Sequence, residues 1–313
     1  MAIPFFSKKE VVLIDPRNLL INLVHCQRVT NNKLMGLYKK DPSFMKYVHL
    51  PLQDLAFHLN LPPNVHQEFF RQFLSISETD LQHYYRQRNI SIITVVDPQY
   101  PPLLKHISDP PAVLFCKGNL QLLQNIRSLS VVGTRNPTEY GCNCIDYFIR
   151  PLARKQWTIV SGLALGIDAM AHWTAIQENT KTIAVIAGGL DHLYPKKNSR
   201  LADIISAEHL ILSEYPPNRK PEKWMFPLRN RIISGLTMGT FVAQASRKSG
   251  SLITAMHALE QGRIVFSPLV PLFDESVFGN IQLLNDGASL VFSDEDIVRE
   301  IRPMLYPFFD DDK

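Results

Sequence analysis

The apolar positions of the chain follow two rhythms, and the change between them falls near residue 128. From there onward, short apolar runs alternate with glycine-containing turns and amphipathic segments. The runs cover residues 129–132, 158–160, 182–187, 209–213, 240–245, 263–266 and 289–292. Such runs are typical of strands buried on both faces of a parallel sheet. Their alternation with helices predicts an α/β fold with a Rossmann-like, doubly wound, mainly parallel sheet that binds ligands at the carboxyl ends of its strands.

Two of the amphipathic segments have apolar residues on a single helix face. One stripe comprises Tyr140, Cys144, Phe148 and Leu152, and the other comprises Leu252, Ala255, Met256 and Leu259. This spacing is typical of helices that cover a core. We therefore expect both stripes to be core and not a cofactor site.

Residues 1–90 have helical periodicity and few strand signals. Apolar residues recur at helical spacing at Leu19, Leu20, Leu23 and Val24, and again at Phe69, Phe70, Phe73 and Leu74. This pattern predicts a small all-helical N-terminal domain of four or five helices. Residues 91–127 contain five prolines between positions 98 and 111. They predict an extended connector that joins the core, because proline disfavours helix. Residues 128–313 then form the Rossmann-like domain.

Composition adds little to this picture. The chain has 313 residues, of which 45% are hydrophobic and 20% charged, and a net charge of +4. These values are ordinary for a soluble globular protein. The N-terminus lacks the order of basic and apolar residues of a signal peptide, and no run reaches the roughly 18 apolar residues of a membrane span. We expect a cytoplasmic protein without membrane contact.

Four cysteines are too few for a disulfide framework in a chain of this length. Cys142 and Cys144 are one residue too close for the usual zinc knuckle, and no second ligand pair follows them. We therefore predict no metal site, and we interpret these thiols as buried groups on a helix.

Two predicted loops leave a strand and enter a helix, where unpaired N–H groups favour anions. The first contains Gly133, Thr134 and Arg135, and the second begins with Ser161 and Gly162. In the first loop, glycine allows close approach of the backbone, and arginine can form a forked contact with a phosphate. The glycines of the second loop do not have the spacing of a dinucleotide-binding motif.

The second loop ends at Asp168, which is either a helix cap or a ligand-binding residue. His172 lies four residues further on, on the same predicted helix face. No serine or cysteine nucleophile is placed to complete a triad with them. We therefore interpret this pair as a structural hydrogen bond.

A third predicted loop follows the strand that ends at Ala245. It contains Arg247, Lys248, Ser249, Gly250 and Ser251. Small residues and positive charge in this loop are suited to a phosphate or a sugar. The P-loop pattern is absent, which argues against ATP binding of that type.

The segment 220–231 is the most distinctive in the chain. Four basic residues flank two aromatic ones, and they are Lys220, Lys223, Trp224, Phe226, Arg229 and Arg231. Cations for the backbone and rings for the bases are the combination that holds single-stranded nucleic acid. A solvated basic turn with a buried aromatic residue remains an equal alternative. Arg229 and Arg231 are expected to open a helix, so one of them is also a candidate for fixing a neighbouring loop.

Taken in order, these segments resemble the DprA (Smf) family of bacterial DNA-processing proteins. The similarity covers about residues 90 to 301, and the ordered set of motifs is more specific than any single one. The matching stretches include 131–135, 160–168, 189–191, 194–195, 226–236, 249–255 and 286–288. Residues 97–102 and 109–115 also fit.

The resemblance implies a protein that binds and protects single-stranded DNA during natural transformation and loads the RecA recombinase onto it. It further implies a homodimer through the Rossmann-like domain, no catalytic activity and no cofactor. The implied lining of the DNA pocket is Arg135, Lys223, Phe226, Arg229, Ser249 and Gly250, with phosphates on the cations and loop amides and a base on Phe226. Our full set of candidate DNA-binding residues adds Gly133, Thr134, Ser161, Gly162, Asn230, Arg231, Lys248 and Ser251.

The chain departs from the family pattern at three places. Gln244 stands where the family usually has glutamate, and residues 267–270 lack the usual Pro-Gly pair. The sequence ends at Lys313 without the winged helix that many relatives append, and the acidic residues 310–312 offer no substitute. The N-terminal helices resemble the small SAM-like domain of some members only weakly.

Two enzyme classes are weaker alternatives. A nucleotide-processing enzyme of the lysine-decarboxylase-like (LOG) group has a glycine-rich loop followed closely by a catalytic glutamate. Here the next acid after Ser251 is Glu260, almost three helical turns further on. An NAD-dependent oxidoreductase would need the glycine motif and the ribose-binding acid, which are missing.

Overall fold

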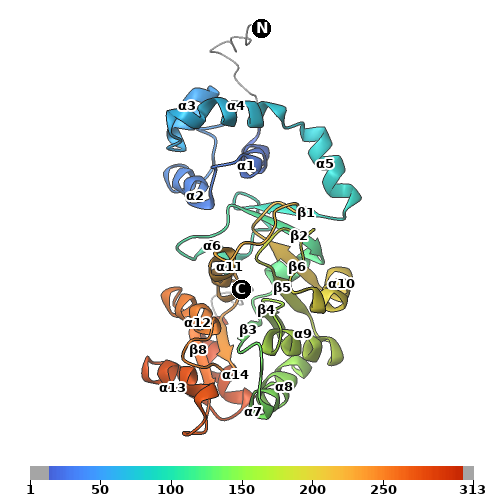
Figure 1. The fold of residues 1–313 in the computed structure, drawn as a ribbon, viewed down its shortest axis with the longest axis vertical. Coiled ribbons are helices and arrows are strands. Elements are labelled where there is room, and N and C mark those ends of the chain that lie inside the picture. The colour runs from blue at the N-terminus through green and yellow to red at the C-terminus, as the bar shows by residue number, and fades with distance from the viewer. Residues whose placement is uncertain (1–13, 306–313) are drawn as a thin grey trace, which may run out of the picture. The chain divides into compact units, whose positions relative to one another are not determined.

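The computed structural model describes residues 14–305, which divide into two compact units (Figure 1). Of the described residues, those up to Tyr100 and Asp109–Leu114 form the first unit, and Pro101–Ser108 and those from Phe115 onward form the second. In the described part of the chain, no helix is both long and apolar enough to cross a membrane.

The first unit is a helical layer followed by one short strand. Its helices are α1 (Pro16–His25), α2 (Asn31–Lys40), α3 (Leu52–His58), η1 (Pro63–Val65), α4 (His66–Ser75) and α5 (Glu78–Gln87), and its strand is β1 (Ser91–Thr94). Asp15 caps α1 by accepting a hydrogen bond from the N–H group of Asn18 at 2.9 Å. Leu19 and Leu23 of α1 and Phe69 of α4 are buried. The predicted helical N-terminal region is thus confirmed.

The second unit is built on a mainly parallel sheet. The strands are β2 (Val113–Gly118), β3 (Ser128–Val132), β4 (Thr158–Ser161), β5 (Thr182–Val185), β6 (Leu210–Ser213), β7 (Gly239–Val242), β8 (Ile264–Pro268) and β9 (Ser289–Val291). The strand order is β1-β2-β6-β5-β4-β3-β7-β8-β9. From β6 to β9 all pairs are parallel, and β2 pairs with β6 antiparallel. Each predicted apolar run from residue 129 onward forms a strand, which confirms the mainly parallel Rossmann-like fold.

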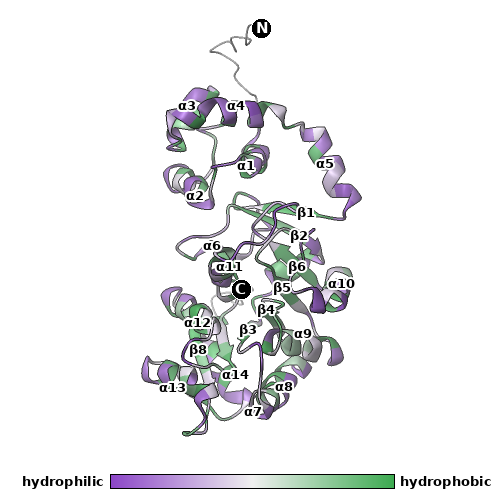
Figure 2. Ribbon diagram, viewed as in Figure 1, coloured by the Kyte–Doolittle hydropathy of each residue, from purple (hydrophilic) through white to green (hydrophobic). Residues whose placement is uncertain are grey.

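Helices connect these strands. They are α6 (Pro102–Lys105), η2 (Leu120–Gln124), α7 (Glu139–Cys144), η3 (Ile145–Ile149), α8 (Arg150–Arg154), α9 (Ile167–Gln177), η4 (Lys196–Asn198), α10 (Ser199–Glu208), α11 (Met225–Gly235), α12 (Ser251–Glu260), η5 (Glu275–Val277), α13 (Phe278–Asn285) and α14 (Asp294–Leu305). The strands are predominantly hydrophobic in Figure 2, whereas the helices mix both colours. The sheet is therefore the centre of the core.

The helical stripe that starts at Tyr140 lies on three consecutive segments, α7, η3 and α8. The middle segment is a π-helical turn. Cys144, Phe148 and Leu152 are buried against the sheet, as predicted.

The stripe on α12 is only partly core, which corrects our prediction. Ala255 is buried, but Met256 is 58% exposed and Leu259 is 40% exposed. The buried face of α12 instead consists of small residues, among them Thr254 and Ala258. Small side chains allow the close packing of α12 on α11 and β7, and the larger apolar residues are left outside.

The strand order also predicts where a ligand-binding crevice lies. Strands β4, β5 and β6 follow one another on one side of β3 within the sheet. The chain then returns to form β7 on the other side of β3. Connections that leave neighbouring strands in opposite directions open a crevice at the carboxyl ends of those strands. The loops after β3 and β7 flank this point.

Candidate nucleic-acid interface

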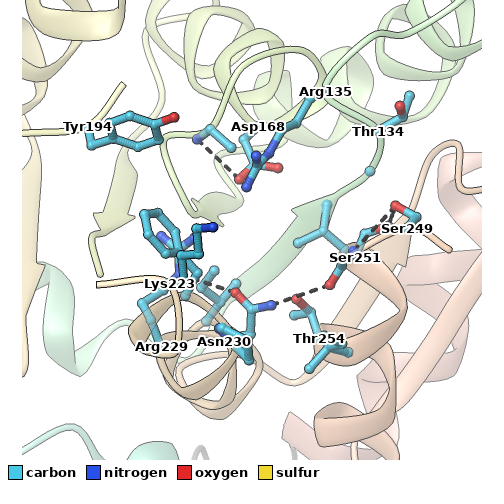
Figure 3. A pocket seen from close by; sticks show the side chains of 18 of the residues that line it. Thr134, Arg135, Asp168, Tyr194, Lys223, Arg229, Asn230, Ser249, Ser251 and Thr254 are labelled. Atoms are coloured by element: carbon cyan, nitrogen blue, oxygen red, sulfur yellow. Dashed lines mark hydrogen bonds between the residues drawn. The ribbon is translucent and has the colours of Figure 1, made fainter. Parts of the chain in front are cut away.

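A pocket of about 780 Å³ opens at the carboxyl ends of β3 and β7. Figure 3 shows Tyr194 and Lys223 on one side of it and Ser249 and Ser251 on the other. Most of the candidate residues line this pocket, namely Gly133, Thr134, Arg135, Lys223, Phe226, Arg229, Asn230, Ser249, Gly250 and Ser251. Ser161, Gly162, Arg231 and Lys248 are not part of this lining.

The loop after β3 presents Arg135, whose side chain is exposed. The loop is fixed by main-chain hydrogen bonds from Thr134 N to Gln244 O at 2.8 Å and from Ile167 N to Thr134 O at 3.1 Å. Gly133 is required here for packing, because a Cβ atom at this position would lie 2.6 Å from Cγ1 of Ile167. The loop is therefore a rigid support for one exposed guanidinium group.

Arg229, by contrast, is buried beneath the pocket. Its Nη1 atom donates hydrogen bonds to the carbonyl oxygen of Gly162 at 2.7 Å and to that of Val185. These carbonyls lie at the ends of β4 and β5, so one side chain of α11 joins two strands of the sheet. Gly162 has no room for a side chain, since a Cβ atom would lie 2.7 Å from Nη2 of Arg229.

Asp168 is the acidic counterpart of Arg229. Its Oδ2 atom accepts hydrogen bonds from the N–H groups of Gly162 at 3.1 Å and Ala164 at 3.4 Å. Burial raises the pKa of Asp168, and Arg229 opposes that rise. Burial lowers the pKa of Arg229 to about 10, against the effect of Asp168 and together with that of Arg135. The floor of the pocket thus carries opposite charges that partly balance.

The predicted hydrogen bond between Asp168 and His172 is wrong. Nδ1 of His172 pairs instead with the hydroxyl of Thr182 at 2.6 Å. Asp168 does not cap α9 either, because the helix begins after Gly166 and the carboxylate turns back to the loop before it. The i, i+4 spacing placed both residues on one helix face, but His172 pairs with Thr182 of β5 and Asp168 with the loop before the helix.

Two further candidate residues have structural contacts. Nη2 of Arg231 forms an ion pair with Oε1 of Glu214 at 2.6 Å, and both side chains are buried. The hydroxyl of Ser161 donates to the carbonyl oxygen of Val131 at 2.6 Å. Both arginines of α11 thus fix neighbouring strand ends.

The aromatic residues of the pocket are accessible. The ring of Phe226 is half-buried and meets the ring of Tyr194 edge-on, with 5.7 Å between the centroids. Tyr194 is 53% exposed and Lys223 is also exposed. Trp224 is 48% exposed and donates from Nε1 to Glu222, so neither ring of the segment is a core residue.

Tyr194 is the main pocket residue that our sequence analysis did not assign to the site. It reaches the pocket from the loop between β5 and η4, which has no basic-aromatic alternation. Lys196 and Lys197 follow it after Pro195 and are exposed. The run Tyr194-Pro195-Lys196-Lys197 has the aromatic and basic residues of a nucleic-acid contact, but its place beside the pocket depends on the fold.

The opposite wall is the N-terminus of α12. Ser249 and Ser251 share a hydrogen bond between their hydroxyls at 2.7 Å, and Asn230 donates from Nδ2 to the carbonyl oxygen of Gly250 at 3.4 Å. The N–H groups of Leu252 and Ile253 donate to the carbonyl oxygens of Ser249 and Gly250 and close a tight first turn. The dipole of α12 favours negative charge at this end of the helix. Gly250 has open space around it, so a ligand can approach its backbone.

The pocket therefore combines accessible cations, two accessible rings and a helix N-terminus. Arg135 and Lys223 provide the exposed positive charge. Asp168 is the only carboxylate among the lining residues, and it is already engaged by main-chain N–H groups. Such a surface is suited to a flexible polyanion that carries planar groups.

Comparison with known proteins bears on this assignment. A family model described as DNA recombination-mediator protein A matches residues 91–302. The DNA processing protein DprA of Bacillus subtilis is 52% identical over 217 residues, which are 69% of this chain and 73% of that protein. DprA of Streptococcus pneumoniae is 43% identical over 232 residues, which are 74% of this chain and 81% of that protein.

Two solved structures are also similar. The X-ray structure of DprA from Streptococcus pneumoniae has a TM-score of 0.82 at 37% identity and covers 92% of this chain and 99% of that one. The structure that describes the single-stranded DNA binding mode of DprA from Helicobacter pylori has a TM-score of 0.61 at 31% identity, with 70% and 96% covered. The resemblance inferred from the sequence motifs is confirmed, and the chain belongs to the DNA recombination-mediator protein A family.

Proposed function

We propose that this protein binds single-stranded DNA in the pocket at the carboxyl ends of β3 and β7. The observation that carries the proposal is the arrangement of accessible groups around the pocket. Arg135, Lys223 and the N-terminus of α12 would contact phosphates, and a base would stack on Phe226 beside Tyr194. The Helicobacter pylori relative, which is described with a single-stranded DNA binding mode, supports the same ligand.

The buried candidates would act indirectly. Arg229 and Arg231 are engaged with carbonyl oxygens and with Glu214, respectively, and they hold the strand ends in place. Lys196 and Lys197, which follow Tyr194, would extend the cationic track beyond the pocket. Their exposed charge would add to affinity without sequence preference.

The proposed role is binding without bond breaking. Asp168 is the one carboxylate of the pocket lining, and its Oδ2 atom is occupied by two main-chain N–H groups. Glu260, at the C-terminal end of α12, is not among the lining residues. This placement does not favour the LOG-type alternative, in which a carboxylate follows the glycine-rich loop closely.

The proposal extends to partners. We propose that the protein protects incoming DNA and loads RecA onto it, and the family description, recombination mediator, supports a role in recombination. A homodimer through the Rossmann-like unit is supported by an apolar groove of about 370 Å³ beside the last strand, β9. Tyr147, Leu269 and Phe292 line this groove and are 61%, 62% and 61% exposed, respectively.

Fluorescence anisotropy with labelled oligo-dT and a duplex of equal length, at several salt concentrations, tests the proposal. We expect binding to oligo-dT without magnesium or nucleotide, and weaker binding to the duplex. The logarithm of the affinity should fall linearly with that of the salt concentration, with a slope near −0.7 for each phosphate contacted. A nucleotide-hydrolysis assay on the same preparation is the counter-test, because clear turnover would favour an enzyme.

A further inference from the structure

Gln244 lies two residues beyond β7 and is fully buried, with 0% of its surface exposed. Its Oε1 atom accepts a hydrogen bond from the N–H group of Thr138 at 3.0 Å. Its Nε2 atom donates to the hydroxyl of Thr138 at 2.9 Å and to that of Ser276 at 2.6 Å. Both ends of the side-chain amide are therefore engaged.

The same residue also holds the other end of the loop after β3. The main-chain oxygen of Gln244 accepts a hydrogen bond from the N–H group of Thr134 at 2.8 Å. Thr134 and Thr138 thus both rest on Gln244, one through its backbone and one through its side chain. Residues 135–137 form a short arch between these two supports, and Arg135 is the charged residue of the arch.

The side chain of Gln244 is tightly packed against its neighbours. A Cβ atom on Gly141, in the first turn of α7, would lie 2.3 Å from Oε1 of Gln244. The amide thus fills the space between the arch, α7 and η5, which contains Ser276. Figure 3 shows Arg135 extending from the Thr134 side of the arch toward Asp168.

We propose that Gln244 is a positioning residue for Arg135, an inference that rests on the proposed binding of single-stranded DNA and deepens it. With both ends of the arch fixed, the guanidinium group is held at the pocket wall before a phosphate arrives. Binding then requires less ordering of the loop, and the affinity is correspondingly higher. Gln244 itself is fully buried and contacts no DNA.

Two substitutions separate the geometry of the amide from its mere presence. Gln244→Met has a similar length but no hydrogen-bonding groups, so the arch keeps its support at Thr134 and loses that at Thr138. Gln244→Glu has two acceptor oxygens, which can receive the N–H group of Thr138 and the hydroxyls of Thr138 and Ser276. The glutamate variant therefore retains the support, and Gln121→Met, at an exposed glutamine of η2, is the matched control.

The experiment measures the affinity of the full chain for oligo-dT, and its salt slope, in a double-mutant cycle with Arg135→Ala. We expect Gln244→Met to bind about 5- to 20-fold more weakly and with a flatter slope, by up to the value of about 0.7 for one phosphate contact. Gln244→Glu should keep the wild-type slope, and Gln121→Met should be unchanged. In the Arg135→Ala background, Gln244→Met should have no further effect, because the residue it positions is gone.

The outcomes distinguish the binding of single-stranded DNA from the positioning role of Gln244. If the wild-type chain does not bind oligo-dT, the proposed function fails. If the wild type binds and Gln244→Met keeps its affinity and slope, or weakens binding equally with and without Arg135, the positioning role is wrong. Circular dichroism reports whether Gln244→Met folds. If it does not, Thr138→Val, which removes one of the hydrogen bonds at an exposed residue, takes its place in the cycle.

Discussion

Three arginines near the pocket have different surroundings, although all three belong to motifs singled out in the sequence. Arg135 is exposed, Arg229 is bonded to two carbonyl oxygens, and Arg231 is paired with Glu214. The sequence predicted their motifs but not their exposure. Exposure depends on the face of α11 on which a residue lies, and both arginines face the strand ends, whereas Leu228 is 43% exposed. The helix begins at Met225 and not, as expected, at the arginines. The helix start has no capping side chain that would mark it.

Phe226 provides the residue-scale test of base stacking. Its ring is accessible and lines the pocket beside Tyr194. Phe226→Ala should weaken binding of oligo-dT by about 1–3 kcal/mol, the usual contribution of one stacked base. The matched control is Trp224→Ala, which removes an exposed ring of the same helix entry that does not line the pocket. Equal losses for the two variants, or loss of the folded circular dichroism spectrum, would speak against stacking on Phe226.

We expect Arg229 to contribute more to the stability of the fold than to direct contact with DNA. Arg229→Met would leave the carbonyls of Gly162 and Val185 without this donor and Asp168 without its cationic neighbour. Removing one partner of a buried charged pair typically costs about 3–5 kcal/mol. We expect a loss of this size in the free energy of unfolding, measured by urea denaturation. Arg302→Met on the exposed side of α14 should change it by less than about 0.5 kcal/mol.

His172 should make the fold sensitive to acid. Burial lowers its pKa from 6.5 to about 3, and the charges of His209 and Arg229 act in the same direction. The unfolded chain takes up a proton on this group as the pH falls below 6.5, whereas the folded protein keeps it neutral until about pH 3. The stabilisation is therefore complete above pH 6.5 and is lost progressively as the pH falls toward 3.

The corresponding measurement is the free energy of unfolding between pH 7 and pH 4. This group alone should contribute a slope of up to about 1.4 kcal/mol per pH unit. Nδ1 of His172 pairs with the hydroxyl of Thr182, which itself donates to Ile159 O. An asparagine can supply the same donor, so His172→Asn should flatten the profile. Parallel profiles for the variant and the wild type would exclude His172 as the source.

At the scale of elements, the strands were predictable and the faces of the helices less so. Strands buried on both faces appear as continuous apolar runs, and all seven runs from residue 129 onward became strands. In α12 the helical spacing of large apolar residues predicts the wrong buried face, because the face that is buried consists of small residues such as Ala255 and Ala258. The pocket could be placed from the loops after β3 and β7, but the wall at Tyr194 required the fold itself.

The packing of α12 leads to a prediction that reverses the expectation from hydrophobicity. Met256→Glu, at a position 58% exposed, should change the free energy of unfolding by less than about 0.5 kcal/mol. Ala255→Leu, at a position 0% exposed, should lower it by about 1–3 kcal/mol, because there is no room for a larger side chain. Urea denaturation of both variants measures this. A larger loss for Met256→Glu than for Ala255→Leu would show that the apolar stripe faces the core after all.

At the scale of the molecule, the affinity for DNA depends on how many copies of the protein bind to one strand. Strand β9 ends the strand order of the sheet, and an unpaired sheet edge is a common site of association. The groove beside it is lined by exposed apolar side chains, including Phe292. Two copies joined here would hold two DNA pockets, so a strand long enough to reach both would bind more tightly than a short one.

Phe292→Arg tests this assembly. A charge in the groove should separate the copies, so light scattering should change from the mass of a dimer to that of a monomer. The affinity for a long oligo-dT should then fall by about 10-fold or more, while that for an oligo-dT too short to span two pockets should stay the same, because only the linked binding is lost. Phe57→Arg, at a 76% exposed ring of the first unit, is the matched control and should remain dimeric. A wild-type chain that is a monomer at all concentrations would contradict the dimer and leave the single pocket as the binding unit.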